Sequence, residues 1–247
     1  MKRYFFECSY DGTNYSGWQI QPNAKTIQEE IENRLSQIYS NEKIEITGCG
    51  RTDAGVHAKQ SFFHVDLKPI MTIEQLQYKL NYMLPADIAI EQILEVASDA
   101  HARFDATERT YHYYLHHKKQ PFHANNSWYH PIVLNVEAMN KAATILLGKH
   151  DFTSFSKLHT DVNNNFCEVY HAEWKVIGDQ LCFEITANRF LRNMVRAIVG
   201  TLIEIGKGEI KVDDMKIIMD DMNRSSAGHS VPAKGLFLYK VAYPFIK

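Results

Sequence analysis

The residues best suited to chemistry lie in one short stretch, Gly48–Ala58. It carries one arginine, one aspartate and one histidine, Arg51, Asp53 and His57, on a backbone with three glycines in eight residues. Glycine reaches positive φ and lets another molecule approach the main chain, so a loop of this kind between strands can serve as a reactive site. Asp followed by Ala-Gly is also ordinary turn chemistry. The stretch alone leaves both interpretations open.

A second group consists of three arginines without a neighbouring acid. Arg189, Arg192 and Arg196 have the spacing i, i+3 and i+7, which places them on one face of a helix predicted over 190–205. Such a row is often a solvated helix face. It could also bind a phosphate backbone, or one arginine could pair with a buried carboxylate in bidentate geometry.

A third group is aromatic. Tyr111 and Tyr113 alternate on one face of a strand predicted over 109–117, beside His117. Aromatic residues on a sheet usually belong to the core. Nucleobases also stack on tyrosine where basic side chains flank a sheet, so a stacking surface is the alternative.

Composition limits the class of protein. The 247 residues are 45% hydrophobic and 23% charged, which fits one large or two ordinary globular domains. Glu7 interrupts the basic and apolar start before a signal core could form, and no segment has the length of a membrane span. Four cysteines without a CxxC pair predict free thiols in a reducing compartment, the cytoplasm.

Charge distribution and motif spacing bear on which ligands the protein can bind. The net charge of −2 argues mildly against nucleic-acid binding, but basic residues cluster around 186–200 and 116–119, and acids around 209–221. The twelve histidines form no HExxH or Cys/His ligand spacing, so no metal is expected. Neither a phosphate-binding loop nor a Gly-x-Ser-x-Gly elbow is present.

Hydrophobic periodicity predicts an α+β fold in two halves. The first half alternates as β-α-β-β-α-β, with strands over 3–10, 44–47, 60–67 and 88–96 and helices after Thr26 and Thr72. The second half repeats the pattern, with strands over 109–117, 168–177, 180–186 and 236–243 and helices over 136–147, 190–205 and 212–222. We therefore expect two ferredoxin-like halves with antiparallel sheets, 1–104 and 105–247, with a cleft between them.

These residues resemble a known family. Gly50–Ala58 reads GRTDAGVHA, which is similar to the signature of the tRNA pseudouridine synthase A (TruA) family. Further stretches match that family in order along nearly the whole chain: 10–12, 15–19, 101–104, 111–113, 151–155, 190, 194–196, 198–200, 233–236 and 241–243.

The resemblance implies a fold, a reaction and a set of roles. The fold would be that of pseudouridine synthases, and the reaction the isomerisation of uridine to pseudouridine at positions 38, 39 and 40 of the tRNA anticodon stem-loop. The family works as a homodimer on tRNA, without metal or organic cofactor. Asp53 would be the nucleophile, Arg196 its ion-pair partner and Tyr111 the ring against the target uracil. Further RNA or substrate contacts are expected from Arg51, His57, Arg189 and Arg192.

The sequence departs from the family pattern at two places. Asp161–Glu168 is neutral to acidic where family members carry a basic RNA-facing segment, and only Glu108-Arg109-Thr110 stands where a basic pair is usual. Two other functions remain open at this point. One is a non-catalytic RNA-binding protein in which Asp53 is only a turn residue. The other is a metal-dependent nuclease or hydrolase that uses Asp53, His57, His64 and Asp66.

Overall fold

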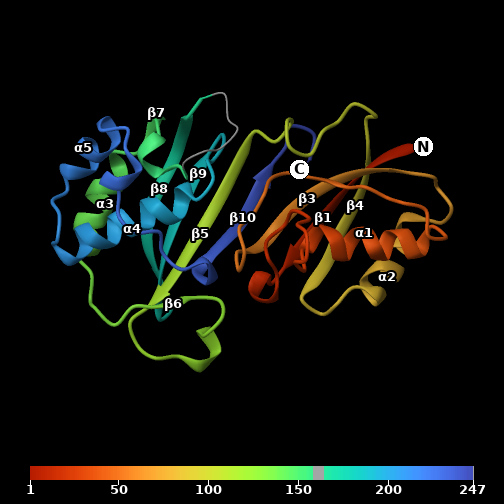
Figure 1. Ribbon diagram of the computed structural model, residues 1–247, viewed down its shortest axis with the longest axis horizontal. Helices are drawn as coiled ribbons and strands as arrows, with labels where there is room; N and C mark the ends of the chain where they lie inside the picture. The colour runs from red at the N-terminus through yellow and green to blue at the C-terminus, as the bar shows by residue number, and fades with distance from the viewer. Residues whose placement is uncertain (158–163, 247) are drawn as a thin grey trace. The chain divides into compact units, whose positions relative to one another are not determined.

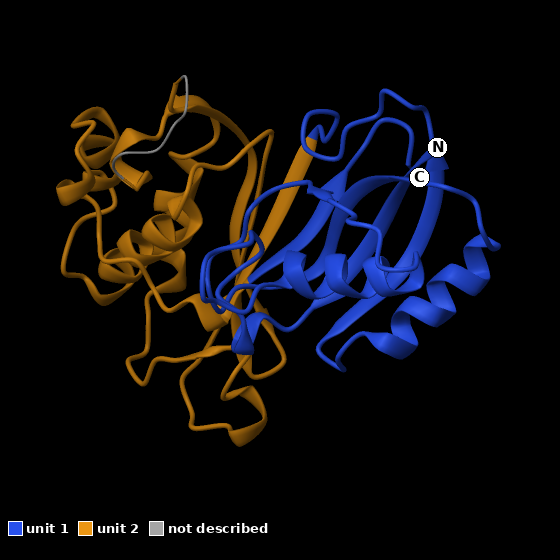
Figure 2. Ribbon diagram, turned by 45° about the vertical axis from the view of Figure 1, so that its right-hand side comes forward, with its two compact units in different colours: residues 1–107, 237–247 blue, residues 108–236 orange. Residues whose placement is uncertain are grey.

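The computed structural model describes residues 1–157 and 164–246 (Figure 1). These residues group into two units by their internal contacts, coloured separately in Figure 2. Unit 1 holds Met1–Thr107 and the chain from Phe237 onward, and unit 2 holds Glu108–Leu236. The predicted division kept 105–247 together, whereas the last strand belongs to unit 1.

Unit 1 is built on a sheet with β1 (Lys2–Tyr10) at its centre. β1 pairs antiparallel with β3 (His57–Leu67) on one side and with β4 (Ile88–Val96) on the other. The two-residue β2 (Thr47–Gly48) pairs antiparallel with β3, and β10 (Leu236–Ala242) runs parallel to β3 at His57 and Ala58. The β-α-β-β-α-β order predicted for the first half is confirmed.

Two amphipathic helices of unit 1 bury one face each. In α1 (Ile27–Ile38) the buried residues are Ile27, Ile31, Leu35 and Ile38, and the Thr26 side chain caps the first turn. In α2 (Ile73–Met83) the capping box between Thr72 and Gln75 is fully formed. Both helices begin where the capping residues predicted.

Two strand predictions in unit 1 need correction. The strand expected over 44–47 is only the pair Thr47–Gly48, because side chains of α1 bond the backbone there: Ile46 N–H donates to Glu32 Oε1 at 3.0 Å, and Gln28 Nε2 donates to Ile46 O at 3.3 Å. The strand expected from Gln60 begins instead at His57, where it pairs with β10. Hydrophobic alternation depends on neighbouring residues, so it cannot predict contacts with α1 side chains or pairing with β10.

Unit 2 contains four neighbouring antiparallel strands. Its strands lie in the order β5 (Glu108–His116), β9 (Gln180–Ala187), β8 (Phe166–Ile177) and β7 (Gly148–Asp151). The short β6 (Trp128–Tyr129) pairs parallel with β5. The β8–β9 hairpin turns at Gly178 and Asp179, as predicted.

The helices of unit 2 are shorter than predicted. They are α3 (Val136–Thr144), α4 (Met194–Lys207) and α5 (Asp214–Asp220). α4 begins four residues later than expected, because Asn193 at its start adopts a left-handed backbone with φ +67°. Short 3-10 helices lie at Gly12–Asn14, Pro121–His123, Thr153–Phe155, Arg224–Ser226 and Ala233–Gly235.

The predicted mixed α+β class with mainly antiparallel pairing is confirmed. Large buried side chains fill a core in each unit, with Phe6 and Phe63 stacked in unit 1 and Trp174 against Phe183 in unit 2. No helix within the described residues combines the length and the apolar character needed to cross a bilayer.

A buried histidine in unit 1 gives a stability prediction. His64 Nδ1 accepts a hydrogen bond from Ala102 N–H at 3.1 Å, and burial, with His101 and Arg3 nearby, lowers the pKa of His64 to about 4. Because the unfolded chain takes up a proton near pH 6.5 and the folded chain only near pH 4, this histidine's stabilisation is complete above pH 6.5. As the pH falls from about 6.5 to about 4, the free energy of unfolding therefore decreases by at most about 3 kcal/mol on account of His64.

His64→Asn keeps an acceptor for Ala102 but does not titrate. We expect its free energy of unfolding, measured by urea denaturation from pH 7 to pH 4, to fall less steeply than that of the wild type. His171→Asn, at a half-exposed ring, is the matched control and should keep the wild-type slope. Equal slopes for His64→Asn and the wild type would contradict the assignment.

Candidate active site

Asp53 opens a tight turn in unit 1. Val56 N–H donates to Asp53 O at 3.1 Å, and Gly55 has φ +74° at the third turn position, where a type II turn requires a positive φ. The side chain of Asp53 is half-buried and Arg51, two residues earlier, is exposed. The turn interpretation is therefore confirmed, and it leaves Asp53 positioned at the start of a fixed bend.

The segment after β1 holds this loop through Thr52. The Tyr10 hydroxyl and Thr52 Oγ1 are 2.9 Å apart in the core, and Trp18 N–H donates to Thr52 O at 3.1 Å. Gly55 N–H donates to Tyr15 O at 3.3 Å. Side-chain and main-chain hydrogen bonds thus fix the residues on both sides of Asp53.

His57, the histidine of the same loop, is only 2% exposed. Its Nδ1 accepts Gly12 N–H at 3.1 Å, and its ring stacks on Phe237 with centroids 4.5 Å apart. A Cβ on Gly12 would lie 2.0 Å from Val56 O, so only glycine allows this approach. The burial of His57 favours a role in holding the loop over direct contact with RNA.

The glycines of the loop have different uses. Gly55 is needed for the turn, whereas a Cβ on Gly48 would collide with the indole of Trp18. A Cβ on Gly50 would have nothing within 4 Å of it. Gly50 therefore leaves space beside the loop.

In unit 2, Tyr111 lies on β5 opposite Ile185 of β9 and is half-buried. Its ring meets Phe190 edge-on, with centroids 5.1 Å apart and planes at 87°. Phe190 was expected on the long helix but precedes it. The contact fixes one edge of the tyrosine ring that the sequence singled out.

Arg196 lies in the first turn of α4 and is half-buried. Its Nε donates to Val231 O at 2.8 Å, and Val231 N–H donates back to Arg196 O at 3.2 Å. The next carbonyl, Pro232 O, accepts the hydroxyl of Tyr113 at 2.9 Å. Tyr113 follows Tyr111 by two residues on the same face of β5, so unit 2 brings the predicted arginine and tyrosine to one region.

Tyr113 does not neutralise the positive charge of Arg196, because its phenol stays protonated. Burial raises the pKa of the fully buried Tyr113 far above its usual range, and the positive charge of Arg196 opposes this shift without reversing it. The phenol therefore stays neutral. Strand alternation predicts only that Tyr113 lies beside Tyr111, and it cannot reveal the proximity of Arg196, which is distant in sequence.

The predicted row of three arginines is wrong. Arg189 and Arg192 precede α4 in a non-helical stretch. At the start of this stretch, Asn188 continues the pairing with Glu168 of β8. The Asn188 carbonyl also accepts a hydrogen bond from Arg109 Nη1 at 3.0 Å. Arg189 lies near Cys167, whose pKa burial raises to about 11 and this arginine lowers. Arg192 is exposed, and its carbonyl accepts Lys157 N–H.

The residues of the hydrolase alternative are engaged elsewhere. Asp66 forms a bidentate pair with Arg3 at 2.8 and 2.7 Å, and His64 accepts the Ala102 amide. Within residues 1–157 and 164–246, no three His, Cys, Asp or Glu side chains are arranged to hold a metal ion. This geometry gives no support to a metal site built on Asp53.

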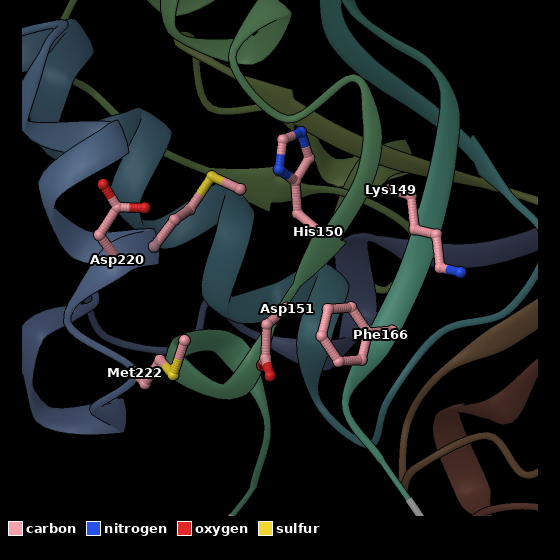
Figure 3. A pocket seen from close by; sticks show the side chains of 7 residues that line it. Lys149, His150, Asp151, Phe166, Asp220 and Met222 are labelled. Atoms are coloured by element: carbon pink, nitrogen blue, oxygen red, sulfur yellow. The ribbon is translucent and has the colours of Figure 1, made fainter.

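Two surface cavities lie away from the predicted residues. The cavity in Figure 3, about 260 Å³, is lined by residues of unit 2 that include His150, Phe166 and Asp220. A cavity of about 690 Å³ in unit 1 lies around Phe104 and Phe245. Neither includes a residue that the sequence singled out for chemistry. Residues 161–163 of the atypical Asp161–Glu168 segment lie outside the described residues.

Comparison with known proteins places the chain in a family. A family model described as tRNA pseudouridine synthase matches residues 8–105 and 142–244. The chain is 50% identical over 245 residues to tRNA pseudouridine synthase A of Parabacteroides distasonis, covering 99% of this chain and 97% of that protein. It is 39% identical over 239 residues to tRNA pseudouridine synthase A of Bacillus subtilis, covering 95% and 96%. The chain belongs to the tRNA pseudouridine synthase A family and is an isomerase.

Proposed function

We propose that this isomerase converts uridine to pseudouridine at positions 38, 39 and 40 of the tRNA anticodon stem-loop, with Asp53 as the nucleophile. The observation that supports this role most directly is the fixed turn. Asp53 starts a bend that the buried Tyr10–Thr52 contact and two main-chain bonds hold in place, while its side chain stays half-buried. A carboxylate that attacks one carbon atom needs such a fixed position.

The reaction begins with removal of the target nucleotide from the stem-loop, which costs a few kcal/mol of stacking and pairing. The exposed Arg51 beside the nucleophile offsets this cost by holding RNA or replacing the base. Asp53 then attacks ribose C1′, or promotes loss of the C2′ proton, and the bond from C1′ to N1 of uracil breaks. The uracil rotates, and as its C5 bonds to C1′ the ester bond between Asp53 and C1′ breaks or, in the second route, the proton returns to C2′. C5 then releases its proton and N1 takes one up.

Arg196 and Tyr111 complete the proposed site. A carboxylate packed against an aromatic ring tends to become protonated, and a guanidinium beside it favours the charged form. Arg196 carries that charge, with Nε fixed on Val231 O. Tyr111, braced by Phe190, packs on the detached uracil and limits its escape. Arg189 and Arg192 remain proposed RNA contacts from the stretch before α4, and His57 acts by holding the loop.

The wider setting follows the family. We propose that the protein acts in the cytoplasm as a homodimer on tRNA, without metal or organic cofactor, and that it adopts the pseudouridine synthase fold. The four cysteines are free and buried, which suits a reducing compartment.

The reaction is tested by tritium release from anticodon stem-loop tRNA labelled at uridine C5, because only rejoining through C5 expels that hydrogen. We expect release by the wild type in excess EDTA, with label lost only at positions 38, 39 and 40. Tight RNA binding without release would overturn the proposed reaction, and release from other positions would overturn the proposed specificity.

Asp53→Asn should bind the same RNA as the wild type and release no tritium above background. The amide keeps the shape of the carboxylate but removes the nucleophile. Circular dichroism and RNA affinity are measured beside activity to show that the fold is intact. More than a trace of turnover by this variant would refute the role of Asp53.

Arg196→Lys should lower kcat by about 100-fold, because lysine is a point charge that cannot bond Val231 O and a carboxylate together in fork geometry. Arg224→Lys is a matched control in the same unit, since Arg224 also donates to backbone carbonyls, those of Ala227 and Gly228. The control should change stability without a comparable loss of kcat. Near-normal kcat in Arg196→Lys would place Arg196 outside the site.

The Tyr10–Thr52 contact gives a test of positioning. Tyr10→Phe and Thr52→Val should each lower kcat about fivefold with unchanged KM, consistent with loss of one buried hydrogen bond. The double variant should be no worse than either single variant, because both changes break the same bond. Tyr39→Phe, at another buried tyrosine of unit 1, should keep wild-type kcat. Additive losses would show that Tyr10 and Thr52 act separately.

A further inference from the structure

The segment that follows β5 is basic in an otherwise mildly acidic chain. Residues 109–136 contain no Asp or Glu, and Lys118 and Lys119 stand side by side at exposed positions. His117 and His123 lie in the same part of the segment, within residues 117–126. Asp179 contacts this segment from the β8–β9 turn, where it accepts a hydrogen bond from Gln120 and lies 3.4 Å from His123 Nε2.

One aromatic side chain of this segment projects into solvent. Phe122 is 91% exposed, the highest value among the large hydrophobic side chains within the described residues. It lies in the 3-10 helix Pro121–His123, which is separated from the lysine pair by Gln120. A phenyl ring left this exposed costs solvation free energy, which favours a partner that covers it.

The backbone around Phe122 is braced rather than loose. Lys234 Nζ donates to Ala124 O at 2.9 Å, and Gln120 Nε2 donates to Asp179 Oδ2 at 2.9 Å. The ring of His116, at the end of β5, lies 5.7 Å from the ring of His123. Phe122 is therefore presented from a fixed loop, which lowers the entropy cost of binding through it.

We propose that residues 117–126, the Phe122 loop, form an RNA-contact surface in which Phe122 stacks on an unpaired nucleobase and Lys118 and Lys119 contact the flanking phosphates. This inference rests on the proposed function, because the RNA is the tRNA substrate. An exposed ring beside adjacent cations matches the two requirements of single-stranded RNA, stacking and phosphate neutralisation.

The loop lies well apart from the reacting nucleotide. Tyr111 and His116 are five residues apart on β5, so at about 3.4 Å per residue the loop starts about 17 Å beyond the tyrosine proposed to pack on uracil. Contacts at that distance add affinity for the RNA and do not touch the bonds that change. The surface should therefore affect KM and Kd and leave kcat unaltered.

The charge of the loop favours RNA over a protein partner. A protein surface that covered Phe122 would also have to neutralise two adjacent lysines, whereas the phosphates on either side of one stacked base do so directly. Because a stacked base must be unpaired, the proposal names a loop or bulge of the tRNA rather than its paired stems.

The test measures binding to anticodon stem-loop RNA and full-length tRNA by fluorescence anisotropy, beside tritium release. Phe122→Ala should raise Kd and KM about tenfold for at least one of the two RNAs, with kcat at saturation unchanged. Phe122→Trp should restore binding and Phe122→Leu should not, since stacking needs an aromatic face. Lys118→Gln with Lys119→Gln should reduce the salt dependence of binding by one to two ions.

Tyr82→Ala is the matched control, because Tyr82 is 82% exposed on α2 in unit 1; it should bind both RNAs like the wild type. Wild-type affinity of Phe122→Ala in an active enzyme would overturn this inference and leave the proposed function intact. Weakened binding by Phe122→Ala in a protein that releases no tritium would do the reverse. Dissociation of oligomers by Phe122→Ala, seen by light scattering, would make the loop a protein interface and overturn the inference.

Discussion

The hydrogen bonds that hold Thr52 are the constraint on which the arrangement of unit 1 depends. Tyr10 ends the central strand β1, and its hydroxyl reaches Thr52 within the core, while Trp18 bonds the carbonyl of the same residue. A buried polar group left without its partner costs about 1–3 kcal/mol, so the contact constrains both segments. The strand that is paired on both sides in unit 1 thereby fixes the residue next to Asp53.

The parts of the fold that sequence could predict are those with local causes. Thr72 and Gln75 predict the start of α2, because a capping box needs only four residues. Gly178 and Asp179 predict the β8–β9 turn. The start of β3 and the shortness of β2 depend on β10 and on Glu32 of α1, which are distant in sequence. Hydrophobic alternation contains no information about such partners.

The same distinction applies to the candidate site. Asp53 could be singled out because adjacent residues determine its turn. The prediction of the arginine row was wrong because one backbone angle ends the helix early. Asn193 has φ +67°, which stops the helix from extending back to Arg192, and helical spacing alone cannot reveal this. The association of Arg196 with Tyr113 through Val231 and Pro232 joins three separate segments of unit 2. Only the folded chain brings them together.

The net charge of the chain is a poor guide to its partner, because charge acts locally on RNA. At an ionic strength near 0.15 M, interactions between exposed charges fade over about 8 Å, so the acids of 209–221 do not cancel cations on another part of the surface. What a phosphate experiences is the charge within a few residues of its contact. A chain of net charge −2 can therefore bind tRNA wherever its folding gathers cations without acids, and 109–136 is the longest such stretch that the fold leaves partly in solvent.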